Sequence, residues 1–138
     1  MKISFLLFAS LCWGLSSETR IAVIKPNKVA TVPVGVSKAV PFSATMGQIH
    51  EVEDKLGGYL KTTQPKLSQK WPYYYRQYLG IQTVGGARKI KANFLCRVNG
   101  DVWKTDWIMV LDGGDCYFNF SYNLDKHEIG EFTVNREA

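Results

Sequence analysis

The 138-residue sequence has few of the residues from which most enzyme sites are built. It contains two histidines and three cysteines, and they do not have the spacing of a metal site. It has no glycine-rich phosphate loop and no nucleophile motif strong enough to name a reaction. We therefore expect a protein without cofactor, without metal and without enzymatic activity.

Long apolar runs are also scarce. The only one covers residues 3–13, follows Lys2 and is itself followed by small residues at Gly14, Ser16 and Ser17. Such a run is too short to span a bilayer, and its order of charged, apolar and small residues is typical of a secretory signal. We interpret residues 1–16 as a signal peptide and expect a secreted or periplasmic protein.

Runs of one charge are absent, although the formal net charge is +5. No cluster of Lys and Arg has the density of a nucleic-acid arm, so we expect no nucleic-acid partner. For an exported protein, a mildly basic face favours an anionic surface or an acidic protein as partner. The basic residues that we expect on one outward face are Arg76, Lys89, Lys91, Arg97 and Lys104.

Three turn pairs divide the alternating apolar pattern of residues 73–123 into strands. The pairs are Gly85-Gly86, Asn99-Gly100 and Gly113-Gly114, and each suits a two-residue hairpin that requires positive φ. Counting outward from each turn predicts an antiparallel meander of four strands with one apolar face. That face would hold Leu79, Ile81, Ile90, Ala92, Phe94, Trp103, Trp107, Phe118 and Phe120.

An amphipathic helix is predicted before the meander. Thr45 and Gln48 have the spacing of a capping box, and apolar residues then recur at helical intervals. Gly57-Gly58 should end the helix near residue 59, and Pro65 and Pro72 should exclude helix thereafter. The helix of residues 46–59 should cover the apolar face of the meander, which predicts an α+β fold.

The remaining segments complete one domain. Prolines interrupt residues 17–44, so we expect an extended N-terminal arm that includes an edge strand. Residues 45–138 would form the α+β domain, and Phe132 and Val134 predict a short fifth strand. The fold class is therefore one helix packed across a four- to five-stranded antiparallel meander.

Cys96 and Cys116 are the two cysteines that would remain after signal removal. Two cysteines in an exported chain are ordinarily paired, but the predicted register places them roughly 26 Å apart at about 3.3 Å per residue. A disulfide requires a much shorter separation. We therefore expect two free thiols, the alternative being that the register is wrong.

The order of arm, helix and four strands resembles the cystatin fold. Gln82-Thr83-Val84-Gly85-Gly86 is similar to the Gln-x-Val-x-Gly hairpin of that family. The resemblance implies a wedge, formed by this hairpin, a second hairpin at the same end and an arm glycine, that plugs the cleft of papain-like cysteine peptidases. Gly35 would be the arm glycine, and the second hairpin would be Asp112, Gly113, Gly114 and Asp115.

The chain departs from the cystatin pattern in its second hairpin. Residues 112–115 carry two carboxylates where the family has Pro-Trp. The C-terminal half also resembles a group of small exported bacterial proteins of unknown function that end in Asn-Gly-x-Ala, although Arg136 stands in place of the glycine. That second resemblance implies no activity.

Two other functions remain open. A helix on a curved sheet could enclose a cavity, as in the nuclear-transport-factor-like enzymes, and a deep polar pocket with a perturbed carboxylate would favour that alternative. A core filled by aromatic rings would favour a binding module. The third possibility is an envelope protein bound through its basic face.

Overall fold

The computed structural model describes residues 19–26 and 39–137. Two helices cover one face of a six-stranded, mostly antiparallel sheet, so the predicted α+β class is confirmed. The expected signal peptide and Gly35 lie outside the described residues.

Helix α2 spans Met46–Thr63 and begins with the predicted capping box. Gln48 N donates to Thr45 Oγ1 at 3.2 Å, and Thr45 N donates to Gln48 Oε1 at 3.0 Å. The apolar stripe of Ile49, Val52, Leu56 and Leu60 is buried against the sheet. The cap and the stripe together fix where α2 starts and which face it turns inward.

Helix α2 does not end at Gly57-Gly58 but continues to Thr63, and a second helix begins at Pro65. The stripe continues to Leu60, and its burial outweighs the roughly 1 kcal/mol that each interior glycine costs. Helix α3 spans Pro65–Lys70 with its proline in the first turn, where no backbone donor is required. The prediction treated proline only as a breaker.

The sheet consists of strands β1 to β6, and both short N-terminal strands pair with the same edge of β3. β1 is parallel to β3 and β2 is antiparallel to it, and beyond β3 the order is β4, β5 and β6. The fifth strand predicted after Leu124 is present as β6. The bounds are β1 Ile21–Val23, β2 Val40–Phe42, β3 Tyr75–Gln82, β4 Arg88–Leu95, β5 Tyr117–Asn123 and β6 Glu128–Val134.

The predicted register of the first hairpin is wrong by one residue. Gln82 pairs with Arg88, because only Gly86 has positive φ (86°) and Gly86 N donates to Thr83 O at 2.9 Å. This is a type I turn followed by a left-handed glycine, which holds one residue more than the expected two-residue turn. Side chains alternate, so the shift puts Leu79 on the face opposite the helices and Tyr78 beneath them.

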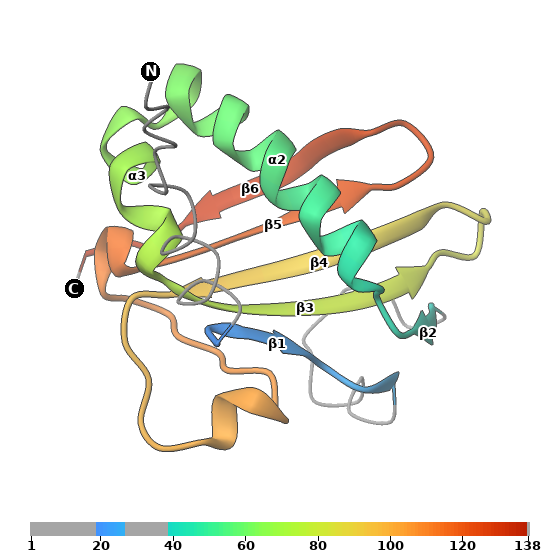
Figure 1. Cartoon of the computed structure of the whole chain (residues 1–138), viewed down its shortest axis with the longest axis horizontal. Helices are drawn as coiled ribbons and strands as arrows, with labels where there is room; N and C mark the ends of the chain where they lie inside the picture. The colour runs from blue at the N-terminus through green and yellow to red at the C-terminus, as the bar shows by residue number, and fades with distance from the viewer. Residues whose placement is uncertain (1–18, 27–38, 138) are drawn as a thin grey trace, which may run out of the picture.

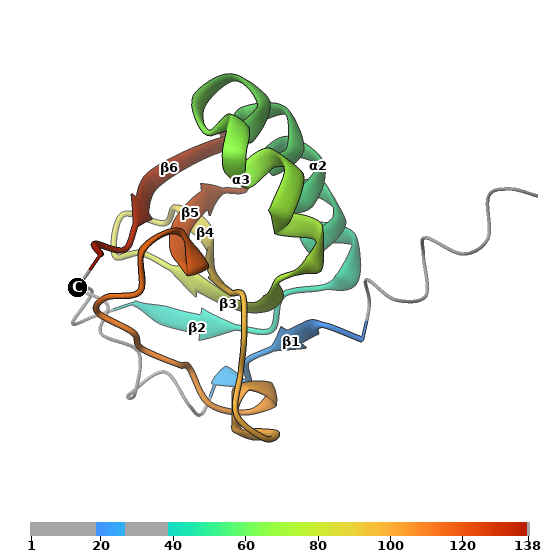
Figure 2. The same cartoon turned by 90° about the vertical axis from the view of Figure 1, so that its left-hand side faces the viewer.

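The predicted strand across residues 103–111 does not exist. β4 pairs directly with β5, with Phe94 opposite Phe118 and Ala92 opposite Phe120. Residues 96–116, here named the crossover segment, instead run across the other face of the sheet (Figure 2). Asn99-Gly100 and Gly113-Gly114 are therefore not two-residue hairpins between paired strands.

Two buried polar side chains hold the crossover segment on the sheet. Gln77 Nε2 donates to the carbonyl oxygens of Trp103 at 2.6 Å and Asp106 at 2.7 Å, and Gln77 Oε1 accepts from Ile108 N at 2.9 Å. Asn93 Nδ2 donates to Ile108 O at 2.7 Å. These side chains supply the backbone partners that a neighbouring strand would otherwise supply.

Cys96 and Cys116 form a disulfide, which corrects the expectation of free thiols. Their Cα atoms are 4.9 Å apart, and Cys96 N donates to Cys116 O at 2.8 Å. The expected separation depended on the strand that the crossover segment replaces. Without that strand, the end of β4 and the start of β5 are neighbours, and the disulfide closes the crossover segment at its base.

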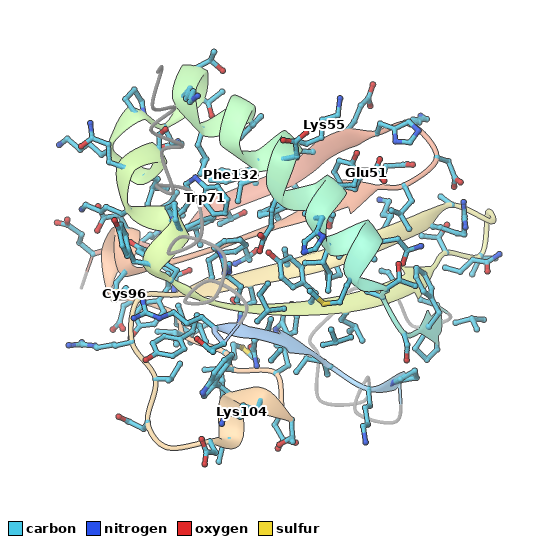
Figure 3. All side chains as sticks on the ribbon, viewed as in Figure 1. Glu51, Lys55, Trp71, Cys96, Lys104 and Phe132 are labelled. Atoms are coloured by element: carbon cyan, nitrogen blue, oxygen red, sulfur yellow. A yellow bond between two sulfur atoms is a disulfide. The ribbon has the colours of Figure 1, made fainter. Side chains whose placement is uncertain are left out.

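Phenylalanine rings fill the space between the helices and the sheet. Phe94 stacks on Phe118 with ring centroids 4.6 Å apart, and Phe132 of β6 packs against Phe118 at 5.5 Å. Figure 3 shows Phe132 and Trp71 pointing into this layer from β6 and from the end of α3. Trp103 and Trp107, expected in the same layer, pack on the opposite face instead.

Arg76 was expected on the outward basic face but is fully buried beneath α2. Its Nε lies 3.3 Å from Glu53 Oε1, and its guanidinium lies 5.9 Å from the centre of the Trp71 ring. Tyr78 donates to the same carboxylate at 2.7 Å. Burial, followed by the Glu53 charge, raises the pKa of Tyr78 well above its ordinary value. The one-residue shift of β3 is what brings Arg76 inward.

Candidate binding surface at the hairpin end of the sheet

Three segments that are distant in sequence meet at one end of the sheet. They are the β3–β4 hairpin of residues 83–87, the β5–β6 turn of residues 124–127, and β2, whose Val40 pairs with Gln82. We name this region the hairpin end. All three lie on the right in Figure 1, whereas Cys96 of the disulfide lies on the left in Figure 3, which has the same view.

The β3–β4 hairpin has a fixed shape. Thr83 N donates to Ala87 O at 2.8 Å, and Ala87 N donates to Thr83 Oγ1 at 3.2 Å. These bonds hold Val84 and Gly85 at the tip, where Val84 is 75% exposed. The motif of residues 82–86 thus places the apolar side chain of Val84 at the tip of a hydrogen-bonded turn, where it is exposed to solvent.

The β5–β6 turn is built by Asn123 and joined to the hairpin. Asn123 Oδ1 accepts from Asp125 N and Lys126 N, both at 2.9 Å. Asp125 accepts from Arg88 N at 3.1 Å and from Arg88 Nη2 at 3.0 Å, and Leu124 N donates to Arg88 O at 2.9 Å. The backbone and side-chain bonds from Arg88 lower the pKa of Asp125. Arg88 therefore connects the two loops into one surface.

The same turn is also attached to α2. His127, in the left-handed region at φ 55°, bonds through Nδ1 to Glu51 Oε1, which also accepts from the Tyr122 hydroxyl at 2.8 Å. The His127 bond, followed by the Tyr122 bond, lowers the pKa of Glu51. The turn is thus anchored to β4 through Asp125 and to the helix through His127.

The hairpin end combines this anchoring with exposed apolar side chains. Val84 and Val40 are 75% and 63% exposed, and Met46, at the start of α2, is also exposed. Apolar side chains on a rigid frame lose little conformational entropy when a partner covers them. The arrangement is suited to binding a concave partner surface.

The residues predicted as a site divide between two ends of the molecule. Gln82, Thr83, Val84, Gly85 and Gly86 lie together at the hairpin end. Asp112, Gly113, Gly114 and Asp115 lie at the opposite end, where Gly114 N donates to Arg136 O at 3.1 Å and Asp115 pairs with Lys70 at 3.0 Å. They are separated because β4 pairs with β5 and not with the crossover segment.

Sequence reasoning missed the β5–β6 turn and the end of β2 as parts of this surface. A signal for the turn was present, since Asn123 followed by Asp125 is typical of a side-chain-stabilised turn. The position of the turn beside the hairpin could not be inferred until the partner strands were known.

The predicted outward basic face is not one continuous patch. Lys89 and Lys91 lie on the outer face, but both pair with Glu131, at 3.2 and 2.9 Å. Lys104 pairs with Asp101 at 2.9 Å on the crossover segment, far from α2 in Figure 3. With Arg76 buried, three of the five basic residues have carboxylate partners on the surface.

The ion pairs of Glu131 with Lys89 and Lys91 can be tested through their dependence on pH. Its hydrogen bond from Lys91, followed by that from Ser121, lowers its pKa to about 2, whereas the ordinary value is 4.5. Since the folded pKa is depressed, the stabilisation is complete above about pH 5 and is lost as the pH falls toward 2. Glu131→Gln should therefore lower the melting temperature at about pH 6 and have a much smaller effect at about pH 2. An equal effect at both pH values, measured by circular dichroism, would contradict the prediction.

Neither a metal centre nor a membrane span is present in the part of the chain that the structure describes. In residues 19–26 and 39–137, no three His, Cys, Asp or Glu side chains are grouped to hold a metal ion. Neither α2 nor α3 is long and apolar enough to cross a bilayer, and the same holds for the other described helical turns. Comparison with family models, with curated proteins and with solved structures found no significant match.

Proposed function

We propose that this protein is a small exported binding module whose hairpin end inserts into the cleft of a papain-like cysteine peptidase and inhibits it. The observation that carries the proposal is the meeting of the β3–β4 hairpin, the β5–β6 turn and β2 at one end, with Val84 and Val40 exposed there. The cystatin-like motif of residues 82–86 forms the tip of this surface.

The proposed contact depends on backbone shape. Gly85 and Gly86 have no side chain, so the hairpin tip is narrow and can approach the walls of a cleft closely. Val84 would fill an apolar subsite, and the β5–β6 turn would take the place that residues 112–115 were expected to occupy. A turn held by its own hydrogen bonds does not extend into the strand-like conformation that a peptidase cleaves.

A binding module is favoured over a cavity enzyme by the packing beneath α2. Phe94, Phe118 and Phe120 occupy the layer in which such an enzyme holds its substrate, and all three are buried. The carboxylates of this face, Glu51 and Glu53, are engaged by Tyr122 and by Tyr78. Aromatic filling of this kind supports a function at the surface.

The proposal predicts inhibition of papain by the mature protein at micromolar concentration or below. Val84→Asp should weaken inhibition by about tenfold or more, because a carboxylate would be desolvated where a valine is covered. Val84 is preferable to Gly86 for this test. Gly86 has φ 86°, and any side chain there would strain the turn itself.

Val102→Asp is the matched control. Val102 is 58% exposed on the crossover segment, next to Trp103, which packs with Leu95 at the end of β4 remote from the hairpin end. The same change in charge should therefore leave inhibition unaltered. Inhibition constants from titration of active papain, with melting temperatures of all three proteins, provide the measurement. No inhibition by the wild-type protein, or equal losses in both variants, would overturn the proposal.

A further inference from the structure

We infer that the outer face of the sheet carries a second binding site, a pocket formed by the crossover segment and Tyr117 that takes a small amphipathic anion with an aliphatic or aromatic body and one carboxylate-like group. The pocket has a volume of about 390 Å³. Its lining residues are Arg97, Val98, Asn99, Val102, Trp103, Ile108, Val110 and Tyr117. It lies on the face opposite the helices, so it is separate from the peptidase contact proposed above.

The floor and walls of the pocket are apolar and well supported. Trp103 is buried, its ring meets Tyr75 edge to face at 5.0 Å, and its carbonyl oxygen accepts from Gln77. Ile108 is held at its backbone by Gln77 and Asn93. Buried polar bonds that fix an apolar wall keep the pocket open in the absence of a ligand, which is typical of small-molecule sites.

The charge of the ligand follows from Arg97, the one charged residue among the lining residues. Arg97 Nε donates to the Tyr117 hydroxyl at 3.5 Å. Among the described residues, no carboxylate lies within ion-pair distance of Arg97, in contrast to Lys89, Lys91 and Lys104. A guanidinium at the edge of an apolar pocket favours a carboxylate, which it can bind through two parallel hydrogen bonds.

The size of the pocket limits the ligand. Sites for small molecules span roughly 300–1,000 Å³, so this one is at the small end of the range. A single short alkyl chain or one aromatic ring system would fill it. Larger lipids would leave most of their apolar surface in water, which argues against a membrane lipid as the ligand.

The disulfide determines whether the pocket exists. All lining residues except Tyr117 belong to the crossover segment, and Tyr117 directly follows Cys116. The bond between Cys96 and Cys116 holds both ends of this segment against β4 and β5. Reduction should therefore weaken binding even where the rest of the fold persists.

Isothermal titration calorimetry with three probes of equal chain length tests the site. Octanoate, octanol and octylammonium share one apolar body and differ in charge. Octanoate should bind, and octanol should bind about tenfold more weakly, because only octanoate brings a charged acceptor to the Arg97 guanidinium. Octylammonium should bind more weakly still, because its charge has the same sign as that of Arg97. No heat of binding with octanoate at millimolar concentration, or equal affinity for all three probes, would overturn the inference.

Variants separate the pocket from general surface binding. Arg97→Gln should reduce octanoate affinity about tenfold while leaving octanol unchanged, and Val102→Trp should fill the mouth and abolish binding of both. Both positions are exposed, so folding should persist, as melting temperatures will show. Lys104→Gln, on the same segment but outside the pocket, is the matched control. A loss with Lys104→Gln equal to that with Arg97→Gln would show that charge alone attracts the probe and would contradict the site.

Discussion

Phe94→Ala should lower the free energy of unfolding by about 3–5 kcal/mol, the range found when a buried aromatic side chain is deleted. Phe94 is fully buried at the centre of the layer beneath α2. Its ring stacks on Phe118 at 4.6 Å and meets Tyr78 and Trp71 edge to face at 6.1 and 6.3 Å. Rings from β3, from β5 and from the end of α3 surround it, so the resulting cavity cannot collapse easily.

Urea or guanidinium unfolding of the wild-type and variant proteins measures the effect. Tyr73→Ala is the matched control, because it also deletes an aromatic ring but at a position that is 62% exposed. It should cost less than about 0.5 kcal/mol. A loss below about 1 kcal/mol for Phe94→Ala would mean that the ring is not in the core.

Removal of the disulfide by the double change Cys96→Ser and Cys116→Ser should lower the free energy of unfolding by about 3 kcal/mol. The estimate comes from the loop entropy that a bond across a sequence separation of 20 removes from the unfolded chain. Thiol titration of the denatured, unreduced protein should find neither Cys96 nor Cys116 reactive. Two reactive thiols from these positions would contradict the pairing.

The double variant should lose stability locally in the crossover segment as well as in the whole fold. The crossover segment is held by the disulfide at its base and by Gln77 and Asn93 along its length. Hydrogen exchange of the amide of Ile108 should therefore accelerate in the double variant, while exchange in α2 should follow only the global change. Equal acceleration in α2 and in the crossover segment would contradict this division.

A structural disulfide also supports the proposal that the protein is exported.

The sequence predicted the elements whose signals are local. The cap at Thr45 and the stripe from Ile49 to Leu56 specify the start and orientation of α2 without reference to other segments. The predicted register of β3 was wrong because it depended on whether Gly85 as well as Gly86 has a positive φ. Gly85 and Gly86 suggested a symmetrical turn, but only Gly86 is left-handed, and the extra residue exchanges the two faces of β3.

The crossover segment could not be recognised from its pattern. Trp103 and Trp107 alternate as strand residues do, but in the structure they cover the outer face of the sheet from an irregular segment. The anchors that allow this are Gln77 and Asn93, whose side chains replace a ladder of strand hydrogen bonds. Buried amides distant in sequence give no periodic signal. For the same reason, the motif of residues 82–86 was predicted while its neighbour, the β5–β6 turn, was not.

The pairing of β1 and β2 with a single edge of β3 also bears on self-association. A bare edge strand offers unpaired backbone groups to which a second molecule can add a strand, the first step toward fibrils. β1 covers β3 at residues 76–78 and β2 covers it at residues 80–82. The other edge, β6, is irregular where Asn119 and Ser121 lose register, and Glu131 there has φ 52°. Intermolecular strand addition is thus hindered at both sides of the sheet, which should keep the protein from forming fibrils at high concentration.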